Sequence, residues 1–238
     1  MIELPELMPV IILAGGLATR LRPLTERIPK ALLEIEGHPF LWHQLHLLKR
    51  NGIRRVVLLV GHLGELIQKE FGDGSSLGIT IDYSFDGPTL LGTAGAIRRA
   101  LPLLPTPFFV LYGDSYLPCD YRGIEAAFRQ SGRSGLMTVY RNDGLYDRSN
   151  VEYINGQILK YDKRDRTAAM HHIDYGLGAF RPEAFAALPP NEPCDLAAVY
   201  QSLLATGNLA AFEVRERFYE IGSPEGIQDT AEFIRSRS

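Results

Sequence analysis

Gly15-Gly16 and Lys30 have the residue types and the spacing of a loop that binds an anion. The apolar run Val10 to Ala14 indicates a buried strand and stops abruptly at the two glycines. Adjacent glycines let the backbone turn without Cβ clashes and bring bare N–H groups close to a bound anion. Arg20 and Lys30 add cations on the same segment. The segment therefore predicts a receptacle for a polyphosphate, with an ordinary tight turn carrying solvated charges as the alternative.

A second candidate site follows another apolar run, where the chain reads Tyr112-Gly113-Asp114-Ser115. A carboxylate beside a glycine at the end of a buried strand is a hard oxygen ligand, well placed for Mg²⁺. A turn-forming aspartate that bonds its own backbone is the alternative interpretation. The pattern thus indicates a metal-binding carboxylate at the end of this strand.

Two familiar phosphate-binding motifs are absent from the sequence. There is no GxxxxGK[ST], which excludes a Walker loop, and GGLATR lacks the G-x-G-x-x-G spacing of dinucleotide folds.

The composition narrows the class of partner. The chain has 238 residues and a formal net charge of −3, which argues against nucleic acid or an anionic membrane as the main partner. Cys119 and Cys194 lie far apart and outside any metal-binding spacing, as suits a reducing compartment. The amino-terminal apolar run is too short for a signal peptide or a membrane span. We therefore expect a cytoplasmic protein.

The elements that must position these residues alternate between short strands and helices, which favours an α/β fold with a layered sheet. The predicted strands are Val10–Ala14, Val56–Val60, Ile79–Tyr83, Phe108–Tyr112, Leu136–Tyr140, Val151–Ile154, Leu177–Phe180 and Ala211–Val214. The predicted helices run from Pro39 to Gly52, near Leu63–Phe71, over Thr93–Leu101 and Leu196–Ala205, and after Pro224. Without a Pro- or Ser-rich linker, we expect one domain over residues 1–238. Residues 1 to about 118 form its nucleotide-binding half by pattern.

The phosphate loop also carries a family resemblance. Gly15 to Thr25 reads GGLATRLRPLT and is followed by Pro29-Lys30, which resembles the GGxGTRLxPLT and PK signature of the sugar-1-phosphate nucleotidylyltransferases. Ala18 stands where the family usually has glycine. The pattern is most similar to the guanylyltransferases of mannose 1-phosphate and D-glycero-D-manno-heptose 1-phosphate. The resemblance implies a Rossmann-like mixed sheet flanked by helices. Residues from about 119 to 238 would then be the sugar-phosphate-binding half, and no C-terminal β-helix is expected.

The reaction that this resemblance implies is attack of a sugar 1-phosphate oxygen on the α-phosphorus of an NTP, with release of pyrophosphate. Because the substrate phosphate is the nucleophile, catalysis should consist of positioning and charge neutralisation. Arg20 would clamp the triphosphate, and Lys30 would neutralise the α-phosphate as charge develops. An NTP and a sugar 1-phosphate are the expected partners, and a homo-oligomer is left open.

The resemblance assigns Asp114 as one carboxylate for Mg²⁺. The family's second metal carboxylate sits in a late W-x-D-I-G-T-P motif, and Tyr219-Glu220-Ile221-Gly222 stands in that place here. Glu220 therefore replaces the usual aspartate, and its extra methylene could still reach the metal.

Two further segments are expected to bind the nucleotide. The predicted contacts are Leu13, Ala14, Gly15, Gly16 and Thr19 in the first loop, and Gly92, Thr93 and Gly95 in an LGTAG segment that resembles the family's border to the base. Asp86 stands where relatives place a residue that reads the base. A carboxylate accepts both donors on the edge of guanine but repels the acceptors of uracil and thymine, which favours GTP. Asp86 could equally be a plain turn residue.

The acceptor side departs from the family. The predicted sugar-phosphate contacts are Ser115, Asn150, Lys163, Asp174 and Gly176. Several family motifs are altered around them, so the resemblance does not identify the sugar. We expect a manno-configured hexose or heptose 1-phosphate. The alternatives are a UTP- or CTP-dependent enzyme for another sugar phosphate or a phosphonate, and a nucleotide-sugar sensor without turnover. Retention of Arg20, Lys30 and Asp114 argues against the sensor.

Overall fold

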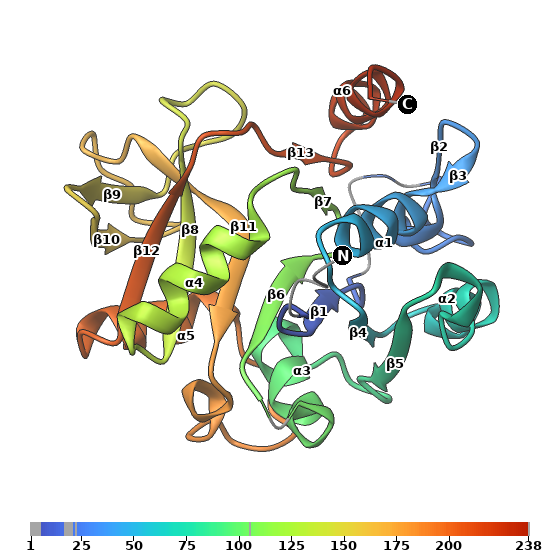
Figure 1. Ribbon diagram of the computed structural model, residues 1–238, viewed down its shortest axis with the longest axis horizontal. Coiled ribbons are helices and arrows are strands. Elements are labelled where there is room, and N and C mark those ends of the chain that lie inside the picture. The colour runs from blue at the N-terminus through green and yellow to red at the C-terminus, as the bar shows by residue number, and fades with distance from the viewer. Residues whose placement is uncertain (1–5, 17–20, 22, 105, 238) are drawn as a thin grey trace, which may run out of the picture.

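The computed structural model describes residues 6–16, 21, 23–104 and 106–237. Within them, a nine-stranded mixed sheet forms the centre of the molecule (Figure 1). Its parallel part has the order β6-β1-β4-β5, and β1 pairs with both β4 and β6. These strands are β1 (Val10–Leu13), β4 (Arg55–Val60), β5 (Thr80–Phe85) and β6 (Phe108–Tyr112).

The sheet continues beyond β6 with antiparallel pairings. The strand β11 runs antiparallel to β6 and to β8, and β12 runs parallel to β8. A hairpin of β9 and β10 extends the edge beside the start of β11. These strands are β8 (Gly135–Arg141), β9 (Val151–Ile154), β10 (Gln157–Tyr161), β11 (His172–Phe180) and β12 (Leu209–Val214).

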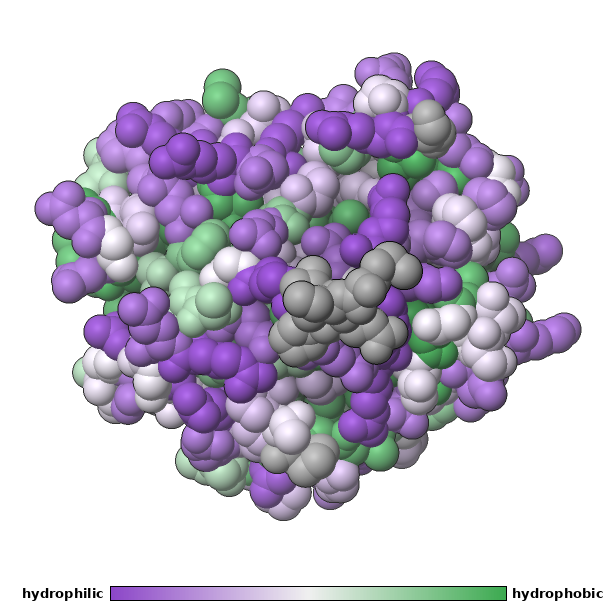
Figure 2. Space-filling model, viewed as in Figure 1, coloured by the Kyte–Doolittle hydropathy of each residue, from purple (hydrophilic) through white to green (hydrophobic). Residues whose placement is uncertain are grey.

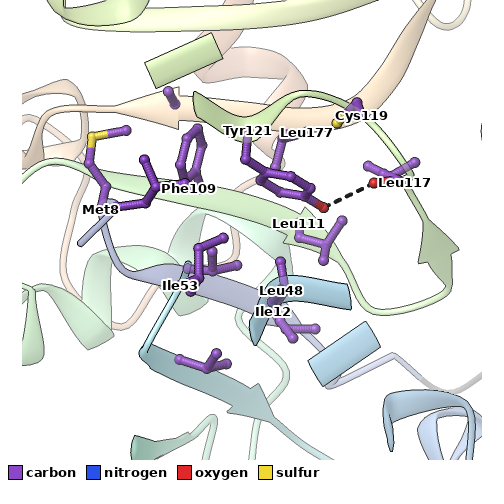
Figure 3. Packing of buried hydrophobic residues seen from close by; sticks show 14 of the residues in the cluster. Met8, Ile12, Leu48, Ile53, Phe109, Leu111, Leu117, Cys119, Tyr121 and Leu177 are labelled. Carbon is purple, nitrogen blue, oxygen red and sulfur yellow. Dashed lines mark hydrogen bonds between the residues drawn. The ribbon is translucent and has the colours of Figure 1, made fainter. Parts of the chain in front are cut away.

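Helices cover both faces of the sheet because its strands are apolar on both sides. Along β1, Val10 and Ile12 belong to one hydrophobic cluster, whereas Ile11 belongs to the other. The first cluster packs against α1 (Phe40–Arg50), α2 (Gly64–Phe71) and α4 (Tyr121–Ser131), and the second against α3 (Gly92–Ala100) and α5 (Leu196–Ala205). Figure 3 shows the first cluster, in which Phe109 from β6 lies beside Tyr121 from α4 and Ile12 lies near Leu48 from α1.

A smaller third cluster joins the last helix to the amino-terminal half. It contains Ile35, Phe40, Ile221 and Ile234. The contributing elements are α1, the hairpin of β2 (Glu34–Ile35) and β3 (His38–Pro39), the pair β7 (Ser115–Tyr116) and β13 (Tyr219–Glu220), and α6 (Pro224–Arg235). Four short 3-10 helices complete the described elements: η2 (Lys30–Leu32), η3 (Ser75–Leu77), η4 (Leu101–Leu103) and η5 (Pro182–Phe185).

The mixed sheet flanked by helices confirms the predicted fold class. The structure adds α4, which the sequence prediction lacks, although Asp120 caps its start and Gly132 follows its end with φ of 64°. It also extends β11 to His172, five residues before the predicted start at Leu177.

The surface is mainly polar. Figure 2 shows hydrophilic residues over most of one face, with small hydrophobic areas between them. In the part of the chain that the structure describes, we find no helix with the length and apolar character of a membrane span.

Candidate active site

A cavity of about 280 Å³ opens at the carboxyl ends of the parallel strands. Its wall includes Leu13 at the end of β1, Asp86 just after β5, and Tyr112 at the end of β6. Ligands of open α/β sheets bind at this edge because loops from neighbouring strands meet there. The first turn of α3 closes one side of the cavity.

The glycine loop lines the cavity through Ala14, Gly15 and Gly16. Ala14 continues the pairing of β1, since its N–H donates to Leu59 O at 2.8 Å. A Cβ on Gly15 would lie 3.2 Å from Gly61 N and 3.6 Å from Asp86 Oδ2. The glycine therefore allows the loop to approach the neighbouring strand end, and it places the loop beside the Asp86 carboxylate.

Lys30 and Asp114 meet at the charged end of the cavity. Lys30 Nζ lies 3.0 Å from Asp114 Oδ2, and both residues line the cavity. The side chains are 20% and 36% exposed, so the pair is accessible to a ligand. One comes from η2 and the other from the turn between β6 and β7.

The turn that carries Asp114 is held from two sides. Gly113 N–H donates to Leu13 O at 3.1 Å, and a Cβ on Gly113 would collide with the same oxygen. Ile221 N–H donates to Asp114 O at 2.9 Å. The strand pair β7–β13 places Glu220 opposite Ser115, the next residue after Asp114. The second predicted metal carboxylate thus comes from 106 positions later in the chain and stands beside the first in the pairing register.

The donor set at this end fits a hard divalent cation. Mg²⁺ is commonly held by one or two carboxylates and completed by water and substrate phosphates. Asp114 lines the cavity, whereas Glu220 pairs with the next residue, Ser115, and does not belong to the cavity wall. Among the described residues, no group of three or more His, Cys, Asp or Glu side chains is arranged for a metal. A ligand phosphate would therefore complete the coordination.

Asp86 lines the cavity just after β5, three strands across the sheet from β6, after which Asp114 comes. It therefore lies at the other end of the cavity from that carboxylate, and it is buried, with 6% exposure. Burial raises the pKa of its carboxyl, while the Leu91 N–H bond and the charge of Arg99 act in the opposite direction. Its Oδ2 accepts that Leu91 N–H at 3.3 Å, just before α3 begins. Arg99 also donates to the main-chain oxygens of Phe85 and Asp86, which fixes the segment. The carboxylate thus both supports the local backbone and faces the cavity.

The LGTAG segment divides between the cavity and the core. Gly92 and Thr93 lie on the cavity wall, and Thr93 Oγ1 accepts Leu196 N–H at 2.7 Å. Gly95 is not part of the wall, since a Cβ there would lie 2.5 Å from Glu192 O. Close packing of α3 on this distant segment therefore explains a glycine at position 95.

The predicted acceptor residues gather around Tyr112 rather than on the cavity wall itself. Lys163 Nζ donates to the Tyr112 hydroxyl at 3.4 Å and lies 5.3 Å from the ring centroid. The Cβ position of Gly176 is 3.5 Å from Tyr112 Cδ2 and 3.5 Å from Ser115 Oγ. Because Tyr112 also lines the cavity, it connects the cavity wall to the residues predicted to bind the acceptor.

Asp174 and Asn150 form a second layer behind this group. Asn150 Oδ1 accepts Asp174 N–H at 2.9 Å, and the Asp174 carboxylate accepts bonds from the Tyr161 hydroxyl at 3.3 Å and Gly176 N–H at 3.1 Å. Burial raises the pKa of the Asp174 carboxyl, partly offset by the Lys163 charge and these hydrogen bonds. The network fixes the backbone beside Gly176.

Two predicted residues, Thr19 and Arg20, lie outside the described residues. Conversely, the sequence prediction assigned no role to Tyr112 and Leu90, which both line the cavity. An aromatic residue directly before the Gly113-Asp114 pair was the available signal for Tyr112.

The cavity therefore combines a glycine loop, a lysine–carboxylate pair and a buried carboxylate at the far end. Oppositely charged groups at one end suit an anion with its counterion, and the apolar walls formed by Leu13, Leu59 and Leu90 suit a flat ring. A ligand with a phosphate end and a hydrogen-bonding base end matches this distribution.

Comparisons with known proteins agree with the geometry. A sequence model of the family described as nucleotidyl transferase matches residues 9–145, more than half of the chain. The catalytic subunit beta of mannose-1-phosphate guanylyltransferase from Danio rerio is 30% identical over 224 residues, which cover 92% of this chain and 62% of that protein. N-acetylmuramate alpha-1-phosphate uridylyltransferase from Neisseria meningitidis serogroup B is 42% identical over 115 residues, which cover 48% of this chain and 50% of that protein.

Solved structures share the fold. A Bacillus anthracis protein described as a glucose-1-phosphate thymidylyltransferase superposes with a TM-score of 0.86 at 21% identity, and the match covers 96% of each chain. The chain spans 62% of the length of its guanylyltransferase relative from Danio rerio.

Proposed function

Because the chain belongs to the nucleotidyl transferase family, we propose that it transfers a nucleotidyl group from an NTP to a sugar 1-phosphate and releases pyrophosphate. The observation that carries this proposal is the pairing of Lys30 with Asp114 at 3.0 Å on the wall of a cavity that the glycine loop also lines. This arrangement supports phosphate chemistry at one end of a nucleotide-sized pocket.

The proposed roles follow from charge and position. Gly15 and Gly16 receive the triphosphate, and Lys30 neutralises the charge that builds on the α-phosphate during attack. Arg20 is proposed to clamp the triphosphate on the evidence of its motif alone. The sugar 1-phosphate provides the nucleophilic oxygen, so the protein needs to align the two substrates rather than to supply a nucleophile.

Asp114 and Glu220 are proposed to hold a divalent cation, with Mg²⁺ as our choice. The metal would neutralise phosphate charge when bound. Lys30 donates a hydrogen bond to Asp114, which keeps the lysine at the phosphate end of the cavity. The same hydrogen bond orients the carboxylate toward the cavity.

The acceptor is proposed to bind next to Tyr112. Lys163 is the cation of that group and suits the acceptor phosphate, while Ser115, Asn150, Asp174 and Gly176 shape the surrounding backbone. We place a manno-configured hexose or heptose 1-phosphate there, supported by the guanylyltransferase relative that matches 92% of the chain.

We propose GTP as the nucleotide on the basis of Asp86. Its carboxylate is buried at the end of the cavity opposite the Lys30 pair, which is where the base of a bound nucleotide would lie. Guanine presents two donors to such an acceptor. UTP is the second candidate, and the 42% identity with a uridylyltransferase over 115 residues favours it.

A pyrophosphate-release screen of the four NTPs against a panel of sugar 1-phosphates tests the proposal. We expect release only with a matched NTP and acceptor, with GTP and a manno-configured acceptor giving the highest kcat/KM. The Lys30→Ala variant serves as the matched control for contaminating activity. Absence of release with every pair would contradict the proposed reaction, and release with UTP alone would replace the guanine assignment with the second candidate.

A further inference from the structure

Gln44 lies in α1 next to the turn that carries Asp114 and does not line the cavity. It is 1% exposed. Its Nε2 donates to Ser115 O at 2.8 Å and to Tyr112 O at 3.2 Å. These two carbonyls belong to the residues that flank Gly113-Asp114, so one amide group bridges both ends of the turn.

The orientation of the amide follows from its partners. Both contacted atoms are carbonyl oxygens, which can only accept, so the nitrogen of the side chain must face them. This leaves Gln44 Oε1 buried without a hydrogen-bond partner among the described residues. A buried unpaired acceptor carries a free-energy cost. The two bonds to the turn are therefore what the side chain contributes at this position.

The remaining contacts of the turn show what Gln44 adds. Leu13 and Ile221 hold the backbone of Gly113 and Asp114 through one hydrogen bond each. Gln44 instead holds the carbonyls of Tyr112 and Ser115, before and after that pair. Helix α1 also packs against η2, the element in which Lys30 lies. Gln44 thus ties the Asp114 turn to the helix that supports Lys30.

From this geometry we propose that Gln44 is a positioning residue, which sets the distance between the Asp114 carboxylate and Lys30 by clamping the carbonyls of Tyr112 and Ser115. The proposal rests on the proposed function for its effect on turnover. Groups that orient a site without touching the substrate typically change activity by about 10- to 100-fold when removed.

The variant Gln44→Met tests the clamp because methionine has a similar length but cannot donate a hydrogen bond. Gln44→Glu is the second variant; it keeps the shape but sets an acceptor against two carbonyls. Gln44→Asn keeps the amide on a side chain shorter by one methylene and should be intermediate. Glu125→Leu is the matched control, since Glu125 is also buried and bonds to a main-chain group, Met8 N–H, at the opposite end of β1.

The first measurement is hydrogen exchange at two reporter amides. Gly113 N–H lies in the turn and donates to Leu13 O, and Ile221 N–H donates to Asp114 O in the turn. In Gln44→Met we expect exchange at both to rise by about tenfold or more, because each hydrogen bond lost weakens the turn several-fold. The control should lower the thermal midpoint but leave the two reporters at the wild-type rate. This readout needs neither substrate nor metal.

The second measurement is steady-state kinetics at a temperature where circular dichroism shows each variant folded. In Gln44→Met we expect kcat to fall by about 10- to 100-fold with little change in KM for the NTP. If Gln44→Met does not fold, hydrogen exchange and kinetics are measured on Gln44→Asn and Gln44→Glu instead.

Wild-type exchange at the reporters, or a wild-type kcat, in the folded variants would overturn the proposal. An equal loss of kcat in Glu125→Leu would also overturn it, because general destabilisation would then be the cause. If the wild-type protein released no pyrophosphate with any NTP, the proposed function would fail by itself, and the exchange data would still decide whether Gln44 holds the turn.

Discussion

Lys30 Nζ and Asp114 Oδ2 lie 3.0 Å apart although 84 positions separate the two residues. Both side chains keep some exposure to solvent, and partly exposed ion pairs contribute little to the free energy of unfolding, on the order of 0–1 kcal/mol. The ion pair therefore matters for where its two charges lie rather than for the stability of the protein. It places a cation and a carboxylate side by side at the phosphate end of the cavity.

Replacing Lys30 by alanine should lower kcat by about 10²- to 10³-fold, the usual loss when one preorganised charge is removed from a developing anion. Binding of the NTP should weaken much less, because the glycine loop remains. Stopped assays of pyrophosphate release and nucleotide titration measure the two quantities. Lys69→Ala, an exposed lysine on α2, is the control. Near-normal turnover in Lys30→Ala would remove this lysine from the mechanism.

The metal carboxylates are tested by substitutions of different severity. Asp114→Asn should abolish Mg²⁺-dependent activity, since a neutral amide is a poor ligand for a hard cation beside phosphates. Glu220→Asp should be tolerated or mildly improved, because aspartate is the residue the family usually has there. Activity is measured across a Mg²⁺ titration, with the exposed Asp73→Asn as the control. Full activity in Glu220→Ala would exclude Glu220 from the site.

The Asp86→Asn variant tests the choice of base. It exchanges one acceptor for a donor that faces the guanine amine, so the preference for GTP over UTP should fall by about 1–3 kcal/mol. UTP should gain relative to GTP because an amide matches one donor and one acceptor. The ratio of kcat/KM for the two nucleotides gives the answer. An unchanged ratio would reduce Asp86 to its role in holding Leu91 N–H.

Gly113→Ala should destabilise the protein by about 1–3 kcal/mol, the usual cost of forcing an extra methyl group into a packed site. The added Cβ would collide with Leu13 O, and the backbone cannot withdraw without breaking the Gly113 N–H bond to that oxygen. Urea unfolding gives the free energy. The control is Gly144→Ala, where a Cβ meets nothing within 4 Å but the backbone φ is 77°. The Gly144 variant measures the loss from backbone strain without a collision. A loss well below about 1 kcal/mol in Gly113→Ala would argue against the collision.

Asp174 should make the stability of the protein fall as the pH rises. Burial raises the pKa of its carboxyl in the folded state. Between the unfolded pKa and this raised value, the folded protein retains a proton that the unfolded chain has released. Stability is therefore highest below the unfolded pKa and is lost as the pH rises through the folded pKa.

Asp174→Asn should remove this part of the pH dependence and be more stable than the wild type at neutral pH. Urea unfolding over a series from about pH 4 to pH 8 compares the two proteins. Asp86, whose carboxyl pKa is also raised by burial, acts with the same sign and remains in the variant. Parallel stability curves for the two proteins would contradict the prediction.

Local patterns were enough to predict most of the elements. Strand β6 and helix α5 have the bounds expected from the sequence, because apolar runs, an Asp195 cap and flanking breakers act within a few residues. The prediction lacked α4, the five-residue strand β10, and the two-residue strands β2, β3, β7 and β13. The paired strands of two residues carry no periodicity of their own, since they exist only where another segment lies beside them.

For the site, the sequence by itself determined which positions hold a charged residue or a glycine and which of them follow the end of a strand. Gly15, Lys30, Asp86 and Asp114 could be selected in this way, and all four line one cavity. Only the tertiary structure decided how these residues meet: that Lys30 pairs with Asp114, that Gly95 packs on Glu192 instead of the cavity, and that Gln44 clamps the Asp114 turn. The reason is physical. A turn or strand end is set by local backbone preferences, whereas a contact between residues far apart in the chain depends on how remote segments pack, and no local pattern contains that information.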